Sequence, residues 1–298
     1  MLILSGCGGK SFNTRLESYS HEPRRYLVET VPFYPQRVDH CGPASLAMAL
    51  NWSGISISPD TLASETFTPS LQGSYQAALI GAARRHGRIA YPIKGPGALL
   101  TEISSGHPVI ILQNMGISFL PSWHYCVVIG YDLDERVFIV HSGDTPNKKI
   151  PLDLFEYTWA KSNYWGLLVL PPETLPATAQ EQNYISAVLG LERLNFLKEA
   201  TVGYTNALSR WPDSLAAITG LGNSYYASNQ LTLAEQTFRN ATIIHPNEGI
   251  FFNNLAQTLL DLGRRKEASI AAKRAVELGG PLVDIYRKTL AETLTTNK

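Results

Sequence analysis

Apolar positions between residues 28 and 170 follow two patterns in succession. Helical spacing comes first, in a run from Pro43 to about Trp52 and in two further runs near residues 74–86 and 97–105. Short apolar runs rich in Val, Ile and Tyr follow, namely "PVIILQN", "HYCVVIGYD", "RVFIVHS" and "YWGLLVL". Such runs, separated by Gly, Asp and Pro, are typical of buried strands. Helices followed by strands predict an α+β domain with an antiparallel sheet.

From about residue 181 the apolar pattern is helical throughout, and it repeats every 34 residues. Small and helix-ending residues recur in register at this spacing. They are Ala200, Ala234 and Ala268, then Ala207, Ala241 and Ala275, then Pro212, Pro246 and, in the third place, Gly280. Because antiparallel helices approach closely only where Ala or Gly leaves room, the repeat predicts stacked pairs of helices.

This repeat resembles the tetratricopeptide repeat. The residues that carry the resemblance are Leu221-Gly222, Tyr225, Ala234, Phe238 and Pro246. The resemblance implies three repeats over about residues 181–280, with a capping helix near residues 282–294, as an all-α solenoid. It also implies a concave surface that binds a peptide or a partner protein, with a purely stabilising appendage as the alternative.

Length and charge narrow the function classes. The chain has 298 residues, of which 44% are hydrophobic and 17% charged, and this composition is typical of a globular chain with two domains. Lys plus Arg balance Asp plus Glu at 25 each, so no net field attracts nucleic acid. The sequence contains no apolar run of the roughly 18 to 20 residues that a membrane-spanning helix needs.

The cysteines have no spacing that indicates a disulfide framework or a metal site. There are three, Cys7, Cys41 and Cys126, and none forms a Cys-x-x-Cys pair. Cys126 lies among Tyr, Val and Ile in an apolar run, so we expect it to pack in the core. The sequence indicates no metal and no cofactor.

Cys41 is placed as a nucleophile would be, at the predicted start of the first helix. A helix N-terminus favours a thiolate, because its unpaired amides and its dipole stabilise negative charge. Gly42 allows a substrate backbone to come close, and Pro43 suits a first helical turn. We expect His124, which begins a strand far along the chain, to be the base. Gln36 can donate a hydrogen bond to the oxyanion beside the Cys41 amide.

The segment "QRVDHCGPASLAMAL" resembles the papain-like clan and, within it, the bacteriocin-processing, double-glycine cysteine peptidases. "GHPVIILQN" and "HYCVVIGYD" resemble the central strands of that family. The resemblance implies a thiol protease that hydrolyses peptide bonds, with Cys41 as nucleophile, His124 as base and Gln36 in the oxyanion hole. Trp123, before the base, either lines the cleft or packs in the core.

The chain departs from the family pattern at two places. His40 stands directly before Cys41, where the family has Asp. The family's third catalytic residue is an Asp that ends the strand after the histidine, and here His141 stands at that position, with Asp144 three residues further on. Either residue is a candidate to orient the base.

The N-terminal residues "LSGC" resemble the bacterial lipobox, whose cysteine carries the lipid anchor of the mature protein. The resemblance implies a lipoprotein of the bacterial envelope, anchored through Cys7. Gly8 after the cysteine points to the outer membrane, facing the periplasm. The predicted organisation is then a signal remnant and tether over residues 1–27, a peptidase domain over 28–170, a proline-rich linker over 171–180, and repeats over 181–298.

Three functions stay open from the sequence. The first is a peptidase whose repeats bind a protein partner or substrate. The second is a catalytically weak or inactive peptidase-like scaffold in an envelope assembly, which His141 in place of the family Asp favours. The third is acyl or amide transfer, which uses the same thiolate.

Overall fold

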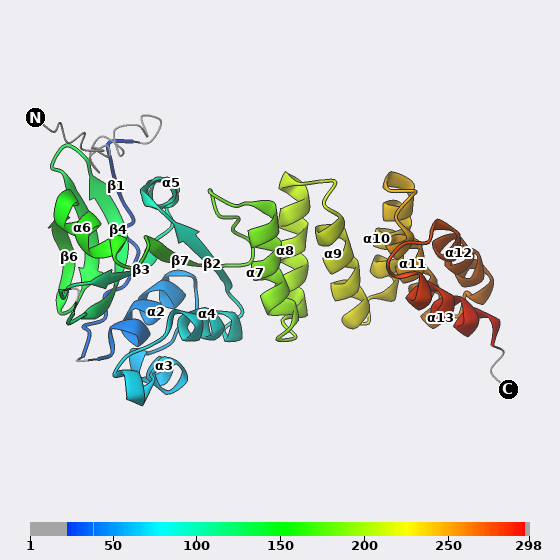
Figure 1. Ribbon diagram of the computed structural model, residues 1–298, viewed down its shortest axis with the longest axis horizontal. Helices are drawn as coiled ribbons and strands as arrows, with labels where there is room; N and C mark the ends of the chain where they lie inside the picture. Colours follow the sequence, from blue (N-terminus) through cyan, green and yellow to red (C-terminus); the bar gives the residue numbers. More distant parts are fainter. Residues whose placement is uncertain (1–22, 38, 118, 296–298) are drawn as a thin grey trace, which may run out of the picture. The chain divides into compact units, whose positions relative to one another are not determined.

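The computed structural model describes residues 23–37, 39–117 and 119–295. The chain forms two compact units that divide between Gln180 and Glu181. The first unit contains a sheet with helices, and the second consists of helices (Figure 1). The predicted fold class, an α+β domain followed by an all-α repeat domain, is confirmed. No helix in the described part combines the length and the apolar character needed to span a bilayer.

An antiparallel sheet forms the centre of the first unit, with seven strands in the described residues. Its order is β2-β7-β3-β4-β5-β6, and β1 pairs with the C-terminal end of β4. The strands are β1 (Arg25–Leu27), β2 (Ile89–Lys94), β3 (Val109–Asn114), β4 (Trp123–Asp132), β5 (Val137–Ser142), β6 (Thr145–Pro151) and β7 (Trp165–Leu170).

Three of these strands lie outside the four predicted runs. β1 uses residues expected to belong to the tether, and its Arg25 pairs with Asp132. β2 contains Pro92, which weakens a strand pattern. β6 is polar, and in it only Ile150 is buried. An apolar pattern therefore could not indicate them.

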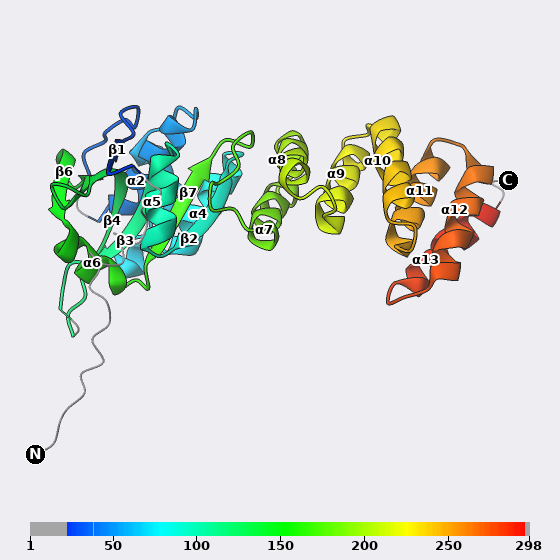
Figure 2. The ribbon, with the colours of Figure 1, turned by 90° about the horizontal axis from the view of Figure 1, so that it is seen from above.

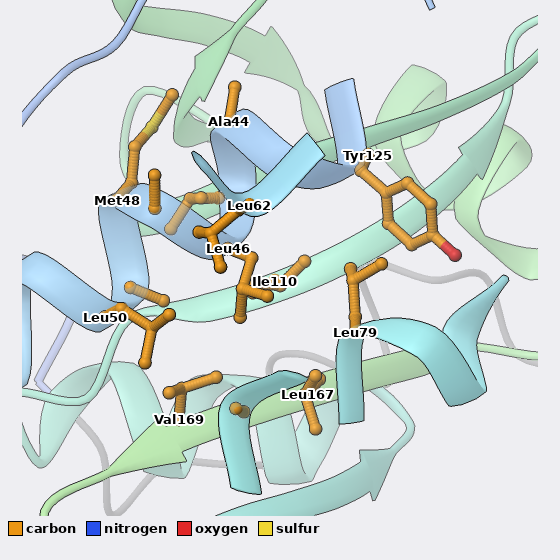
Figure 3. Close-up of a cluster of buried hydrophobic side chains, with 14 of the residues drawn as sticks. Ala44, Leu46, Met48, Leu50, Leu62, Leu79, Ile110, Tyr125, Leu167 and Val169 are labelled. Carbon is orange, nitrogen blue, oxygen red and sulfur yellow. The ribbon is translucent and has the colours of Figure 1, made fainter. Parts of the chain in front are cut away.

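Helix α2 (Cys41–Trp52) covers one face of the sheet. Every residue from Gly42 to Leu50 is buried, so this helix is held on almost all sides. Figure 3 shows its side chains against Ile110 of β3 and against Leu167 and Val169 of β7. The other helices of this unit are α3 (Pro59–Thr66), α4 (Gln76–Arg85), α5 (Pro96–Ser104) and α6 (Leu152–Ala160).

Helix α6 packs on the opposite face of the sheet. Its Phe155 stacks on Phe138 of β5 at a centroid distance of 4.1 Å. Its Thr158 Oγ1 accepts a hydrogen bond of 2.7 Å from Gln113 Nε2 of β3. Gln113 and Ile110 are three positions apart on one strand, so they face opposite layers.

The proline-rich segment, residues 171–180, belongs to the first unit. Glu102 of α5 is completely buried and accepts hydrogen bonds from the Ala177 amide at 3.2 Å and the Thr178 amide at 2.7 Å. The Thr178 hydroxyl and His107 Nδ1 also bond to this carboxylate. These donors lower the pKa of Glu102 although its burial alone would raise it.

We expect Glu102→Gln to destabilise the first unit by about 2 kcal/mol at neutral pH, because an amide cannot accept from all four donors. A carboxylate with a lowered folded-state pKa stabilises the fold above its unfolded pKa, and this contribution disappears as the pH falls through the folded pKa. Urea unfolding of both proteins should therefore differ at pH 7 and converge in strong acid. Glu135→Gln, at an exposed ion pair with Lys149, is the control and should change stability little. Equal stability of Glu102→Gln and the parent at pH 7 would contradict this expectation.

The second unit consists of three helix pairs and a final helix. The first helices of the pairs and the final helix begin at Glu181, Leu215, Gly249 and Val283, which are 34 residues apart. Both Figure 1 and Figure 2 show the pairs stacked in chain order. The helices are α7 (Glu181–Glu192), α8 (Leu197–Arg210), α9 (Leu215–Ala227), α10 (Leu231–Ile244), α11 (Gly249–Asp261), α12 (Arg265–Leu278) and α13 (Val283–Leu294).

Glycines set the spacing between helices of this unit. A Cβ on Gly220 would lie 2.2 Å from the ring of Tyr204, and one on Gly222 would lie 2.4 Å from the ring of Phe238. Both rings are buried. The aromatic side chains of α8 and α10 therefore both rest on the bare backbone of α9 between them, which accounts for small residues at these two positions.

Candidate active site

Cys41 is the first residue of α2, as the sequence predicted for a nucleophile. Its sulfur accepts hydrogen bonds from its own amide and from those of Gly42 and Tyr125. Tyr125 directly follows His124 on β4, so this contact places the thiol beside the strand that carries the predicted base. Cys41 is partly buried, and the buried helix behind it fixes its position.

Burial raises the pKa of the Cys41 thiol above its ordinary value. The three amides act in the opposite direction, and the nearby Asp39 carboxylate raises the pKa further. Asp39 holds a left-handed backbone conformation, with a φ of 62°. His40 turns away to stack on Phe67, with ring centroids 5.0 Å apart. The resting nucleophile is therefore a neutral thiol at neutral pH.

His124 lies near the start of β4 and is partly buried. Its Nε2 shares a hydrogen bond of 2.9 Å with the Ser142 hydroxyl at the end of β5. Burial lowers the pKa of His124, and the positive charge of Lys148 on β6 lowers it further. The His124 imidazole is therefore neutral at neutral pH, and it can accept a proton as a base.

Ser142 is the partner of His124 that the sequence did not indicate. β4 pairs with β5 through Val127↔His141 and Val128↔Val140. Successive residues of a strand point to opposite faces and paired residues share a face, so Ser142 shares the face of His124 and His141 points away. The segment "FIVHS" shows that His141 and Ser142 point to opposite faces, but only the pairing of β5 with β4 shows which of them lies on the face of His124.

Neither His141 nor Asp144 occupies the position beside His124. His141 is buried, its Nε2 lies 3.1 Å from the Val31 carbonyl, and its Nδ1 accepts from the Asn147 amide at 3.2 Å. Asp144 lies in the tight turn between β5 and β6, where it accepts from the Thr145 hydroxyl at 2.9 Å and is exposed. Gly143, with a φ of 63°, makes this turn.

Gln36 joins three parts of the site. Its Nε2 donates to the Ser45 hydroxyl of α2 and to the Tyr125 carbonyl of β4, both at 3.2 Å. Its Oε1 accepts from the Gly143 amide at 2.9 Å, and its own amide donates to the Gly143 carbonyl at 2.8 Å. Both amide hydrogens thus have acceptors, so donation to an oxyanion requires the exchange of one of them.

Gly42 directly follows Cys41 in the sequence, and Trp123 directly precedes His124. A Cβ on Gly42 would lie 2.7 Å from Ser74 Oγ, so close packing here requires glycine. Trp123 is 46% exposed, and so it does not pack as a core residue. The β3–β4 loop before it also exposes large apolar side chains, which are Met115, Ile117, Phe119 and Leu120.

Cys126 is fully buried, with its thiol 3.4 Å from Gln113 Oε1, and burial raises its pKa. Cys7 lies outside the described residues. Within the described residues, no group of three or more His, Cys, Asp or Glu side chains is arranged to hold a metal ion.

Sequence comparison agrees with this arrangement. Residues 28–166 match the model of the Peptidase_C39 like family. This match supports a cysteine peptidase family for the sheet unit, as the sequence resemblance implied. The match includes Gln36, Cys41 and His124.

Solved structures resemble each unit separately. A C39-like peptidase from Bacillus anthracis is 21% identical over 49% of this chain and 97% of its own, with a TM-score of 0.43. The peptidase domain of Streptococcus ComA, a bifunctional ABC transporter of a quorum sensing pathway, is 23% identical over 47% and 98%, with a TM-score of 0.40. The Sgt2 TPR domain from Aspergillus fumigatus is 23% identical over 39% and 78%, with a TM-score of 0.37. No curated protein matches the chain.

Proposed function

We propose that the C39-like domain is a cysteine endopeptidase that uses Cys41 and His124. The observation that carries this proposal is the hydrogen bond from the Tyr125 amide to the Cys41 sulfur, which sets the thiol beside the residue that follows His124. His124 takes the thiol proton as sulfur attacks the peptide carbonyl. It then gives this proton to the departing amine as the C–N bond breaks. Water hydrolyses the resulting thioester, with His124 again as the base.

The oxyanion has one fixed donor in this proposal. The Cys41 amide is the first of helix α2 and points toward the reacting centre, where a developing negative charge gains most from it. Gln36 becomes the second donor when its Nε2 exchanges the Ser45 hydroxyl for the oxyanion. Its remaining bonds to Tyr125 and Gly143 keep the side chain in place during this exchange.

The exposed apolar loop supports a preference for peptides with bulky apolar side chains. Trp123 immediately precedes the base, and Phe119 of the same loop is 87% exposed. Asn114 Oδ1 accepts from the amides of Gly116 and Ser122, so the ends of the loop are held together. A preformed apolar surface next to the base suits a substrate side chain near the bond that is cut.

The test is covalent labelling by a thiol-directed peptidyl probe. We expect the full-length chain to be labelled at Cys41, and Cys41→Ala to lose the label. Cys126→Ala is the matched control and should keep it, because the Cys126 thiol is fully buried. If the parent chain is labelled no more strongly than Cys41→Ala, the peptidase proposal is wrong.

A weak or inactive scaffold is the second candidate function, and Ser142 favours it. A serine hydroxyl orients the base but supplies no negative charge to stabilise an imidazolium. Labelling of Cys41 by a small alkylating reagent without any peptide turnover would support this candidate.

We also propose that the repeats bind a protein partner or substrate, and that the chain is a lipoprotein of the bacterial envelope, anchored through Cys7. The second proposal rests on the sequence "LSGC". Incorporation of radiolabelled palmitate into the parent and its loss in Cys7→Ala would support the anchor. Recovery of the unlabelled parent in the soluble periplasmic fraction would remove it.

A further inference from the structure

A pocket of about 690 Å³ opens between α10 and α12 in the second unit, with α11 as its floor. The floor is apolar and comes mainly from α11. Its residues are Phe252, Leu255, Leu259, Ile270 and Ala271. Ile270 of α12 is 70% exposed, so the pocket presents part of its apolar lining to solvent.

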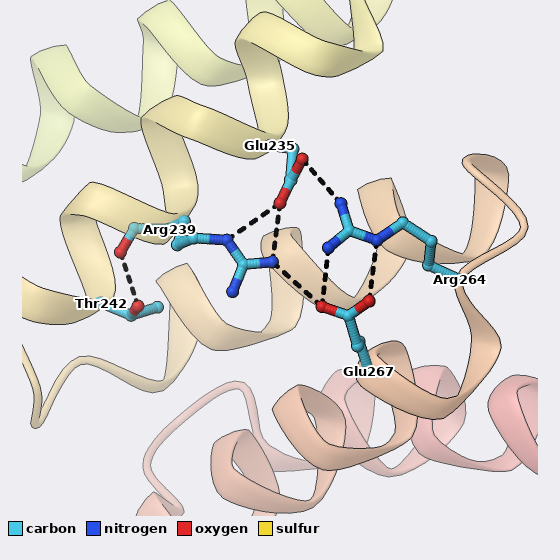
Figure 4. A network of polar contacts seen from close by, with 5 residues as sticks. All are labelled: Glu235, Arg239, Thr242, Arg264 and Glu267. Carbon is cyan, nitrogen blue, oxygen red and sulfur yellow. Dashed lines mark hydrogen bonds and ion pairs between the residues drawn. The ribbon is translucent and has the colours of Figure 1, made fainter.

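One end of the pocket is closed by charges that neutralise one another. Arg239 bonds to Glu235 at 2.6 Å and reaches Glu267 across the pocket at 3.4 Å. Arg264 pairs with the same two carboxylates, at 2.9 and 2.7 Å (Figure 4). Two arginines and two glutamates leave no net charge for a ligand at this end.

The other end keeps a positive charge. Lys273 lines the pocket on α12, three residues after Ile270 and therefore on the same helix face. It is exposed, and within residues 23–37, 39–117 and 119–295 no carboxylate lies within ion-pair distance of it. The neighbouring Arg274 pairs with Glu277 at 3.4 Å. An apolar floor thus lies beside one uncompensated ammonium group.

We propose that this pocket binds a segment of a protein partner that presents a bulky apolar side chain next to a carboxylate. The apolar side chain packs against the apolar floor of the pocket, and the carboxylate pairs with Lys273. This inference rests on the proposed partner binding by the repeats and is independent of the chemistry at Cys41. It assigns the binding to the α10–α12 side of the helix stack.

Phage-displayed peptides selected on the full-length Cys41→Ala chain provide the test, because that chain cannot cleave its ligand through the thiol. We expect selected peptides to share a Leu, Ile or Phe beside an Asp or Glu. Fluorescence anisotropy with a synthetic peptide of that consensus should show a loss of affinity of about ten-fold or more in Lys273→Glu. Ile270→Asp should lose at least as much.

Lys288→Glu is the matched control, since it reverses the same charge on α13 at an exposed position outside the pocket. It should bind the peptide as the parent does. Circular dichroism should show that all variants remain folded, because each altered side chain is exposed. Selection of no consensus, selection of a consensus without an acidic residue, or equal binding by Lys273→Glu and the parent would overturn the proposal. None of these outcomes would alter the labelling of Cys41, so the peptidase proposal is judged separately.

Discussion

Replacing His124 with alanine is expected to lower kcat/KM for peptide cleavage by ~10⁴-fold or more, about as much as replacing Cys41. The pKa values explain why the two losses should be alike. The Cys41 thiol has a raised pKa and the His124 imidazole a lowered one, so neither is charged at neutral pH. Without the imidazole, no base in the site accepts the thiol proton during attack.

A double variant tests whether the two residues act as one unit. Cys41→Ala/His124→Ala should be no slower than either single variant, because each substitution already removes the shared step. His86→Ala is the control, since His86 pairs with Glu65 at the end of α4. Full turnover by His124→Ala, or losses that multiply in the double variant, would show that His124 is not the base of Cys41.

Replacing Ser142 with aspartate is expected to raise kcat/KM by about 100-fold at neutral pH. The Ser142 hydroxyl lies 2.9 Å from His124 Nε2, so a carboxylate there would bond to the imidazole and raise its pKa. The imidazolium would in turn lower the pKa of Cys41. The thiolate then exists at neutral pH, whereas in the parent it forms only above the ordinary pKa range of a thiol.

Alkylation of Cys41 by iodoacetamide measures this change directly. In the parent, the rate should rise only in alkaline solution, and in Ser142→Asp the midpoint of that rise should move to lower pH. Ser142→Asn is the matched control, because it keeps size and hydrogen bonding but adds no charge. An equal midpoint in the Asp and Asn variants would mean that position 142 does not control the charge of His124.

The elements with strong periodicity could be predicted from the sequence. The helix after Cys41, the strand after Trp123 and the 34-residue repeat all follow from apolar spacing, because burial dictates those positions. The candidates Gln36, Cys41 and His124 came from residue chemistry and family resemblance. In the structure, Gln36 donates to the Tyr125 carbonyl and the Cys41 sulfur accepts from the Tyr125 amide. His124 directly precedes Tyr125 in the chain.

The third residue of the site could not be predicted in the same way. The sequence favoured His141 or Asp144, because one ends the strand and the other is a carboxylate. Which residue faces His124 depends on the strand register, and β5 pairs with both neighbours through bulges, at Val128/Gly130 and at Val140/Ser142. A bulge changes the face of every later residue, and no local pattern shows where it occurs.

The bonds between Gln36 and Gly143 also bear on when the site can form during synthesis of the chain. These residues are 107 positions apart, and Ser142 lies immediately before the second of them. A ribosome-bound or truncated chain that ends before this turn carries the Cys41 thiol without the partner of its base. On the proposed mechanism such a chain lacks a complete site, and Cys41 and His124 act together only after the turn after β5 has closed on Gln36.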